Sequence, residues 1–213
     1  MLKIWGRINS SNVQKVLWTC DTLNIPYERI EAGMHHGVNN SAQYRDMNPN
    51  GRIPTIDDDG FVLWESNAIV RYLCAKHDSQ GLLMPLDLQA RANADRWMDW
   101  ATSTLAPAIT PLFWQLIRPA PTGPKADQIA SAREETSKAL AVLDHGLRGK
   151  AFVAGDAVSM GDIPCAIQVY RWFEMLGVED ATFKRPDYKN LAAWYARLHT
   201  VPQFKKWVAI AVT

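Results

Sequence analysis

The apolar positions in the first part of the chain predict alternating strands and helices. Residues 3–6 and 27–31 are short segments that we interpret as strands. Between them, apolar residues recur at helical spacing, and Ile25-Pro26 ends the pattern. This apolar stripe consists of Val13, Val16, Leu17, Cys20 and Leu23. A short helix between two strands implies that the strands are parallel and joined by a right-handed crossover.

A second pattern, from residue 48 to residue 73, predicts a hairpin followed by a helix. Residues 54–56 and 61–64 are short apolar runs, and three aspartates and Gly60 form the turn between them. A helix with an apolar stripe follows, and a short helix is expected near residues 41–47. The order is therefore strand–helix–strand, a variable segment and strand–strand–helix. This order predicts an α/β domain over residues 1–80, with one mixed sheet and helices on both faces in a thioredoxin-like arrangement.

The strand pattern stops at residues 78–87, a polar segment that we interpret as a linker. Residues 88–213 carry only helical periodicity and are predicted to form an all-α helical domain. One helix is expected to begin near residue 90 and to bend at Pro107 and Pro111. Further helices are expected near residues 125–147, 162–176, 190–199 and 202–208.

Ser159 and Asp162 carry the signal of a helix start. The Ser159 hydroxyl is expected to cap the amide of Asp162, while the Asp162 carboxylate reaches back to Ser159. We interpret this pair as a folding device rather than a catalytic one. If the pair is buried, Asp162→Ala is expected to cost about 1–2 kcal/mol.

Composition and charge exclude several classes of function. The 213 residues carry a formal net charge of +1, divided as −1 over residues 1–80 and +2 over residues 81–213. Neither part is basic enough to indicate a nucleic acid or an anionic membrane as partner. No apolar run is long enough for a membrane span, and we expect no signal peptide because the first residues lead directly into a strand.

The cysteines and histidines argue against a protein thiol or a metal as the reactive group. Cys20, Cys74 and Cys165 are far apart, form no CxxC motif and fall on apolar sides of predicted helices. We therefore expect buried free thiols in a reducing, cytoplasmic setting. His35 and His36 are adjacent and would point apart, and no histidine spacing matches a metal site, so no metal is expected.

The start of the first helix carries three candidate hydrogen-bond donors, Ser10, Ser11 and Asn12. Each of these residue types favours a helix N-cap, and capping alone is one interpretation. In the other interpretation, one of them donates a hydrogen bond to an anionic sulfur and so lowers the pKa of a thiol.

The hairpin and the helix after it carry a second set of candidates. Pro54 leads a strand, and a cis bond after Ile53 would turn the Ile53 backbone outward, where an extended ligand pairs like an added strand. Glu65 and Ser66 lie at a helix N-terminus, which favours a carboxylate. The alternative is an ordinary hairpin and a capped helix without a ligand.

With both halves in view, the chain resembles the cytosolic glutathione S-transferases over nearly its full length. It is most similar to bacterial members of the serine or asparagine type, of theta-, beta- or nu-like classes. The motifs that carry the resemblance are Asn9-Ser10-Ser11-Asn12 before Lys15-Val16, Asn48-Pro49-Asn50-Gly51-Arg52-Ile53-Pro54, Trp64-Glu65-Ser66-Asn67-Ala68-Ile69, and Ser159-x-x-Asp162. The resemblance implies a glutathione-binding domain followed by a helical domain, a homodimer, and glutathione as co-substrate with no other cofactor.

The resemblance also implies roles for single residues in the second motif and the third. The Ile53 backbone would pair with the cysteinyl part of glutathione, with Pro54 in the cis form. Glu65 and Ser66 would hold the γ-glutamyl end, and Arg52 would assist the glycyl end or the backbone.

Three residues remain candidates for the group that activates the thiol. Ser10 matches the serine of serine-type families, Asn12 matches the asparagine of some bacterial and fungal relatives, and Ser11 is a further ligand-contacting candidate. No tyrosine or cysteine occupies this loop, so the chain differs from the tyrosine-type and cysteine-type classes. We expect Ser10, with Asn12, to stabilise the glutathione thiolate for attack on a hydrophobic electrophile.

Several alternatives stay open on function. Glutathione-dependent peroxide or disulfide reduction is one, and a specialised dehalogenase, isomerase or lyase is another. A third is a non-catalytic, glutathione-binding regulatory protein on the same scaffold. Residues 35–40 are either a solvated loop or a contact to the glycyl carboxylate.

The resemblance places the second substrate and the dimer contact only loosely. The acceptor pocket is expected between the domains, near residues 107–117, with Phe113 and Trp114 as candidates; the alternative for both is plain core. A homodimer would use Ile69, Tyr72 and the helix that carries Trp97.

Overall fold

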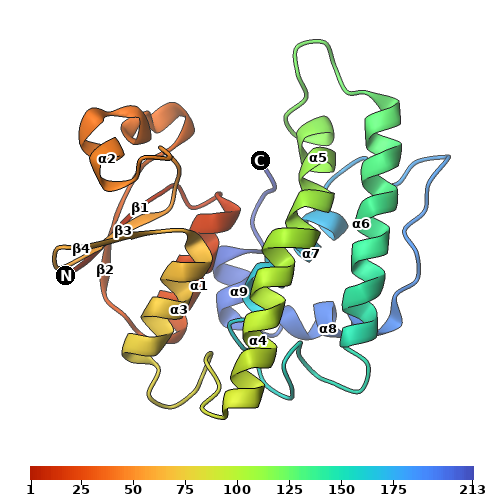
Figure 1. Cartoon of the computed structure of the whole chain (residues 1–213). Coiled ribbons are helices and arrows are strands. Elements are labelled where there is room, and N and C mark those ends of the chain that lie inside the picture. Colours follow the sequence, from red (N-terminus) through yellow and green to blue (C-terminus); the bar gives the residue numbers. More distant parts are fainter. The chain divides into compact units, whose positions relative to one another are not determined.

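The computed structural model describes residues 1–213, which divide into one unit over residues 1–86 and a second over residues 87–213 (Figure 1). The elements of the first unit are β1 (Leu2–Trp5), α1 (Ser11–Thr22), β2 (Tyr27–Ile30), η1 (Met34–His36), η2 (Val38–Asn40), α2 (Ala42–Met47), β3 (Thr55–Asp58), β4 (Phe61–Trp64) and α3 (Ser66–His77). The elements of the second unit are α4 (Leu88–Trp100), η3 (Ala101–Leu105), α5 (Ala106–Leu116), α6 (Ala126–Gly146), α7 (Asp162–Glu174), α8 (Lys189–Leu198) and α9 (Pro202–Trp207).

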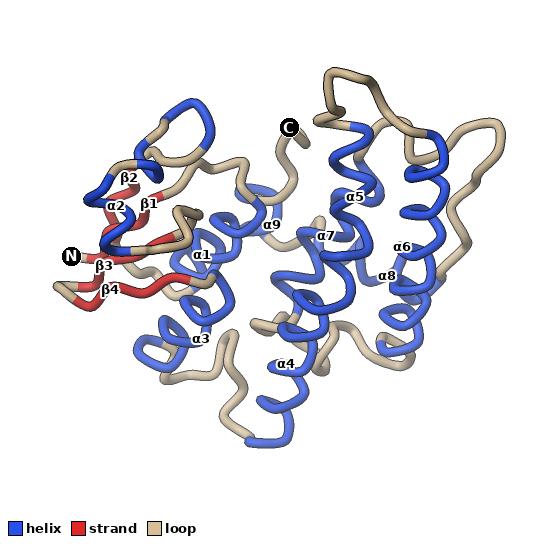
Figure 2. Tube along the Cα trace, turned by 45° about the horizontal axis from the view of Figure 1, so that its top comes forward, coloured by secondary structure: helices blue, strands red, loops and turns tan.

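The first unit is built on a mixed sheet with the strand order β2-β1-β3-β4. Strand β1 is parallel to β2 and antiparallel to β3, and β3 is antiparallel to β4. Ile4 and Ile56 face each other across the centre of the sheet and are fully buried. Helices α1 and α3 lie side by side on one face of the sheet, and α2 lies on the other (Figures 1 and 2). The predicted fold class is confirmed.

The hairpin turn is tighter than the aspartate run predicts. Asp57 and Asp58 belong to β3, where they pair with Val62 and Phe61. Only two residues, Asp59 and Gly60, connect the strands, and both have positive φ, at 52° and 95°. A two-residue turn of this kind matches the twist of the strands, which is why the ladder extends further than expected.

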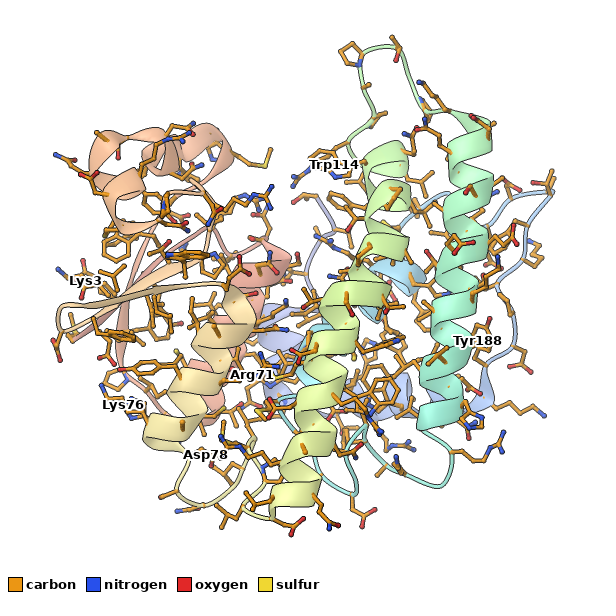
Figure 3. All side chains as sticks on the ribbon, in the orientation of Figure 1. Lys3, Arg71, Lys76, Asp78, Trp114 and Tyr188 are labelled. Carbon is orange, nitrogen blue, oxygen red and sulfur yellow. The ribbon has the colours of Figure 1, made fainter.

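The segment after α3 is organised by one carboxylate. Asp78 lies directly after α3 (Figure 3) and is buried. Its two oxygens accept hydrogen bonds from three backbone amides, those of Leu82, Leu83 and Met84, at 2.7–2.8 Å. The polar segment that the sequence suggests as a linker is therefore fixed to the end of α3.

The second unit is helical, as predicted, and its only strand-like contact is an isolated bridge between Phe152 and Gly155. The long first helix changes to the wider π-helical form in η3, directly before α5. Pro107 lies in the first turn of α5, directly after this π-helical segment. In a regular α-helix its ring would clash with the carbonyl four residues earlier, and the wider turn relieves this clash. None of the helices combines the length and the apolar character needed to cross a membrane.

All three cysteines are buried and form no disulfide, as expected. Burial raises the pKa of the Cys20 thiol to about 12, so this thiol is protonated and unreactive at neutral pH. The structure places no group of three or more acidic, histidine or cysteine side chains where a metal ion would bind.

Asp162 is the centre of a buried network in the second unit. Its oxygens accept hydrogen bonds from the Val153 amide, the Ser159 amide, the Ser159 hydroxyl and the Trp194 indole, at 2.8–2.9 Å. Burial raises the pKa of the Asp162 carboxyl, and the four donors oppose that rise. The predicted cap is half wrong: the Asp162 carboxylate does reach back, but the Ser159 hydroxyl donates to it instead of capping the Asp162 amide.

We expect Asp162→Ala to lower the free energy of unfolding by about 3–5 kcal/mol, more than the sequence suggests. Four donors from three segments would be left without an acceptor in a buried space, and each carries a desolvation cost. Chemical denaturation of this variant measures the loss. Asp156→Ala, at a loop position outside the network, is the control, and a loss below about 1 kcal/mol at Asp162 would contradict the expectation.

Candidate functional site

The topology of the sheet brings three predicted motifs to one edge of the first unit. Strands β1 and β4 run in the same direction, and β3 runs against both, so the ends of β1 and β4 meet the start of β3. The register shows this directly, because Trp5, Thr55 and Trp64 are aligned across the three strands. The chain segments that continue from this row are the start of α1, the approach to β3 and the start of α3.

A polar pocket of about 80 Å³ lies at this edge. Its lining consists of Asn12, Asn48, Asn50, Arg52, Ile53, Pro54, Glu65 and Ser66. Six of the eight predicted site residues are therefore brought together. Ser10 and Ser11 are absent from the lining. Asn48 and Asn50, which belong to the second motif but had no predicted role, also line the pocket.

Two buried side chains fix the direction of the backbone before β3. The Arg52 carbonyl accepts hydrogen bonds from the Tyr44 hydroxyl at 2.7 Å and from the Asn48 amide at 2.9 Å. In a trans peptide the carbonyl and the next amide point in opposite directions, so the Ile53 N–H points away from these two residues. Neither the N–H nor the C=O of Ile53 has a partner in the structure. The Ile53–Pro54 bond is cis, as expected.

Three buried polar side chains support the peptide group between Arg52 and Ile53. Tyr44, Asn48 and Thr55 are nearly inaccessible, at 1%, 2% and 0% exposure. The Thr55 hydroxyl lies 2.8 Å from the Tyr44 hydroxyl and accepts a hydrogen bond from the Asn48 amide at 3.0 Å. Burial raises the pKa of the Tyr44 phenol, which stays a hydrogen-bond donor at neutral pH.

The start of α3 has an unusual backbone conformation. Glu65 is exposed and has φ 71° and ψ 108°, a region that L residues seldom adopt and that costs about 1–3 kcal/mol. Its carbonyl accepts the first helical hydrogen bond, from the Ile69 amide. The N-terminus of α3, with its positive dipole end, lies at the same pocket that Glu65 and Ser66 line.

The start of α1 carries a side-chain donor that makes no hydrogen bond within the chain. Ser10 is the N-cap residue, but its side chain makes no cap hydrogen bond, and its exposure is only 8%. Its hydroxyl therefore stays uncommitted beside the N-terminus of α1. Ser11 is the first residue of α1 and is partly exposed, whereas Asn12 reaches the pocket.

A chain of side-chain contacts joins the two helix starts. The Lys15 ammonium donates to the Ser66 hydroxyl at 3.2 Å, and the Ser66 hydroxyl donates to the Asn12 amide oxygen, also at 3.2 Å. Lys15 and Ser66 are buried, at 5% and 6% exposure. Lys15 appears in the first motif of the resemblance, but no role was predicted for it.

The variable segment after β2 has a structural role instead of lining the pocket. It forms two 3₁₀ turns, η1 and η2, rather than a plain loop. The Asn39 amide donates to the Gly51 carbonyl at 2.7 Å, which ties η2 to the approach to β3. In η1, the His36 Nε2 atom lies 3.4 Å from the Glu31 Oε2 atom.

Several aromatic and apolar candidates turn out to be core residues. Phe113 is buried at 4% exposure, whereas Trp114, near the end of α5, is half exposed (Figure 3). Ile69, expected at a dimer contact, is 0% exposed, so its side chain has no surface to offer a second copy. A dimer contact through Tyr72 and the helix that carries Trp97 stays a prediction. The acceptor pocket itself stays a prediction.

The first unit is a thioredoxin-like domain, because it has a mixed sheet, a cis-proline at the start of β3 and an open backbone edge. It is joined to a helical domain, the second unit. Family comparisons specify this class further. Residues 9–76 match the model of the glutathione S-transferase N-terminal domain, and residues 105–202 match that of the glutathione S-transferase C-terminal domain. The chain belongs to the glutathione S-transferase family.

Individual relatives agree with this assignment. The chain is 39% identical to glutathione S-transferase GstB of Escherichia coli K12, with both chains covered completely. It is 42% identical to the theta-class glutathione S-transferase of Xanthomonas axonopodis pv. citri, solved with glutathione bound, with a TM-score of 0.90 over 100% of this chain and 99% of that one. Glutathione transferase F7 of Populus trichocarpa is 25% identical, with a TM-score of 0.86 and complete coverage of both. The prediction of a glutathione transferase is confirmed.

We expect Asn48→Ala to weaken glutathione binding about tenfold, because the Arg52–Ile53 peptide loses one of the two bonds that fix its direction. The same variant should lose about 1–3 kcal/mol of stability, since the Arg52 carbonyl and Thr55 hydroxyl each lose a partner. Calorimetric titration with glutathione measures the first effect. Asn40→Ala, at an exposed asparagine, is the control, and an unchanged affinity in Asn48→Ala would contradict the expectation.

Proposed function

We propose that the protein binds glutathione at the pocket of the first unit, activates its thiol and transfers the thiolate to an electrophilic, hydrophobic substrate. The observation that carries this proposal is the unpaired Ile53 backbone, which lies between the starts of α1 and α3. An extended peptide-like ligand pairs with such a backbone edge as an added strand would. The cysteinyl residue of glutathione is the part that would occupy this position.

The charges around the pocket match the two ends of glutathione. The Ser66 backbone amide and the N-terminus of α3 suit the α-carboxylate of the γ-glutamyl residue, and the Glu65 carboxylate suits its ammonium group. Arg52 is exposed and suits the glycyl carboxylate. Since ligand pockets usually measure about 300–1,000 Å³, this small pocket would hold one end of the tripeptide while the rest extends along Ile53.

Ser10, with Asn12, would stabilise the thiolate. A thiol pKa near ~8.5 must fall by about 2 units for glutathione to be largely ionised at neutral pH, which requires roughly 2.7 kcal/mol. The uncommitted Ser10 hydroxyl, the Asn12 amide and the helix dipole of α1 together supply an effect of this size. Ser11 would contact the ligand from the first turn of α1.

We expect Ser10→Ala to raise the pKa of bound glutathione by about 1–2 units, and Asn12→Ala to raise it by about 1 unit. Each variant removes one hydrogen bond to the anionic sulfur and leaves the Ile53 edge intact, so glutathione should still bind. Ultraviolet titration of the bound thiolate measures the pKa. A larger shift in Asn12→Ala than in Ser10→Ala would reverse the assignment of the principal donor.

The activity itself is tested on the unmodified protein. Glutathione binding by calorimetry, together with conjugation of an aryl halide, would agree with the proposal. Binding without turnover on aryl halides, hydroperoxides and disulfides would favour a non-catalytic binding protein. Turnover on hydroperoxides or disulfides alone would favour the reductase alternative. The half-exposed Trp114 offers one aromatic surface for the second substrate.

A homodimer in the cytoplasm forms part of the proposal. A groove of about 780 Å³ between η3, α5 and α6 gives the second unit a concave surface where a second copy would pack, and Val142, a half-exposed apolar residue, lines it. The buried thiols suit a reducing compartment. Sedimentation at twice the chain mass of 24.0 kDa is expected, and sedimentation at the mass of a single chain would contradict the dimer.

A further inference from the structure

Lys15 is a buried cation directly behind the proposed glutathione pocket. Its side chain lies between α1 and α3, and only 5% of the residue is exposed. Lysine is almost never buried to this extent unless it is paired, because removing an ammonium group from water costs several kcal/mol. An apolar residue at this position would extend the buried face formed by Val13, Val16 and Leu17, so packing alone does not account for a lysine.

The contacts of Lys15 set the direction of a hydrogen-bond chain. An ammonium group only donates, so the Ser66 hydroxyl accepts a hydrogen bond from Lys15 and uses its own O–H to donate one to the Asn12 amide oxygen. The Asn12 side chain then accepts through its oxygen, which leaves its NH₂ group unpaired. Asn12 lines the pocket, so its unpaired NH₂ group is available to a ligand bound there.

We propose that Lys15 is a positioning residue of the reaction: through Ser66 it holds the Asn12 amide with its NH₂ group toward the glutathione sulfur. This inference rests on the proposed function, because it needs a thiolate at the site. Without Lys15, the Ser66 hydroxyl would be able to accept from Asn12 instead. The Asn12 amide would then turn over and present its oxygen, which repels a thiolate, to the sulfur.

The other charged groups at the pocket are few. Arg52 faces it from the approach to β3, and Glu65 faces it from the start of α3. They lie on the side that would receive the ends of the tripeptide. Lys15 approaches from behind, from within α1, and reaches the pocket through Ser66.

Lys15→Met is the decisive variant, because it keeps the length of the side chain and removes the donor. We expect the pKa of enzyme-bound glutathione to rise by about one unit, and kcat at neutral pH to fall severalfold and recover at high pH. KM for glutathione should change less than kcat. Lys3→Met, at an exposed lysine of β1 (Figure 3), is the matched control and should leave the pH profile unchanged.

Two further variants separate positioning from a direct effect of charge. Lys15→Arg keeps a group that only donates and should restore the pKa of the bound thiol. In an Asn12→Ala background, Lys15→Met should cause no further shift, because the group that it positions is gone. A shift that persists in that background would overturn the inference, as would an unchanged pKa in Lys15→Met alone.

A separate outcome identifies failure of the proposed function. If the unmodified protein binds no glutathione, or binds it without a thiolate signal, the function is wrong and Lys15 has no sulfur to act on. If Lys15→Met does not fold, Ser66→Ala cuts the same chain. Ser66→Ala should raise the pKa of the bound thiol in the otherwise unmodified protein. In the Asn12→Ala background it should leave that pKa unchanged, and a shift that persists there would overturn the inference.

Discussion

The direction of one peptide group, between Arg52 and Ile53, controls the character of this site. Because the Arg52 carbonyl is bonded to Tyr44 and Asn48, the Ile53 amide must face the opposite way. If that peptide were reversed, the backbone edge would offer a carbonyl where a peptide ligand needs a donor. The pocket residues contributed by the two helices would then surround a backbone that could not align a ligand. The buried Tyr44–Asn48–Thr55 cluster is therefore as much a part of the site as the residues that line it.

Topology explains why this peptide lies beside two helix N-termini. Each helix follows a strand, α1 after β1 and α3 after β4, and these strands run in the same direction. The strand between them runs the other way, so its start joins their ends. One edge of the sheet thereby collects two positive dipole ends and one open backbone edge. Such a combination suits a small anionic peptide better than a neutral or cationic molecule.

The sequence predicted the elements of the fold well because the signals are local. Helical spacing, the turn residues and the proline at the start of a strand all lie within a few positions of the structure that they specify. Lys15 and Ser66 are 51 positions apart, and no local pattern relates them. The same holds for burial: the sequence pattern does not distinguish an apolar residue at an interface from one in the core, and the structure places Ile69 in the core. The predicted Ser159 cap was wrong for another reason. The direction of a hydroxyl hydrogen bond depends on all the donors and acceptors around its partner.

The contrast between two polar networks shows what marks a binding site in this protein. The Asp162 network is closed, because both of its carboxylate oxygens are bonded to donors from the surrounding segments. At the sheet edge, the Ile53 amide, the Ser10 hydroxyl and the Asn12 NH₂ group are donors without partners. These donors lie at an edge that is open to solvent, since Asn12 is exposed and Ile53 is partly exposed, so a ligand with acceptor groups can bind them in place of water. A peptide that carries a thiolate and carboxylates offers such acceptors.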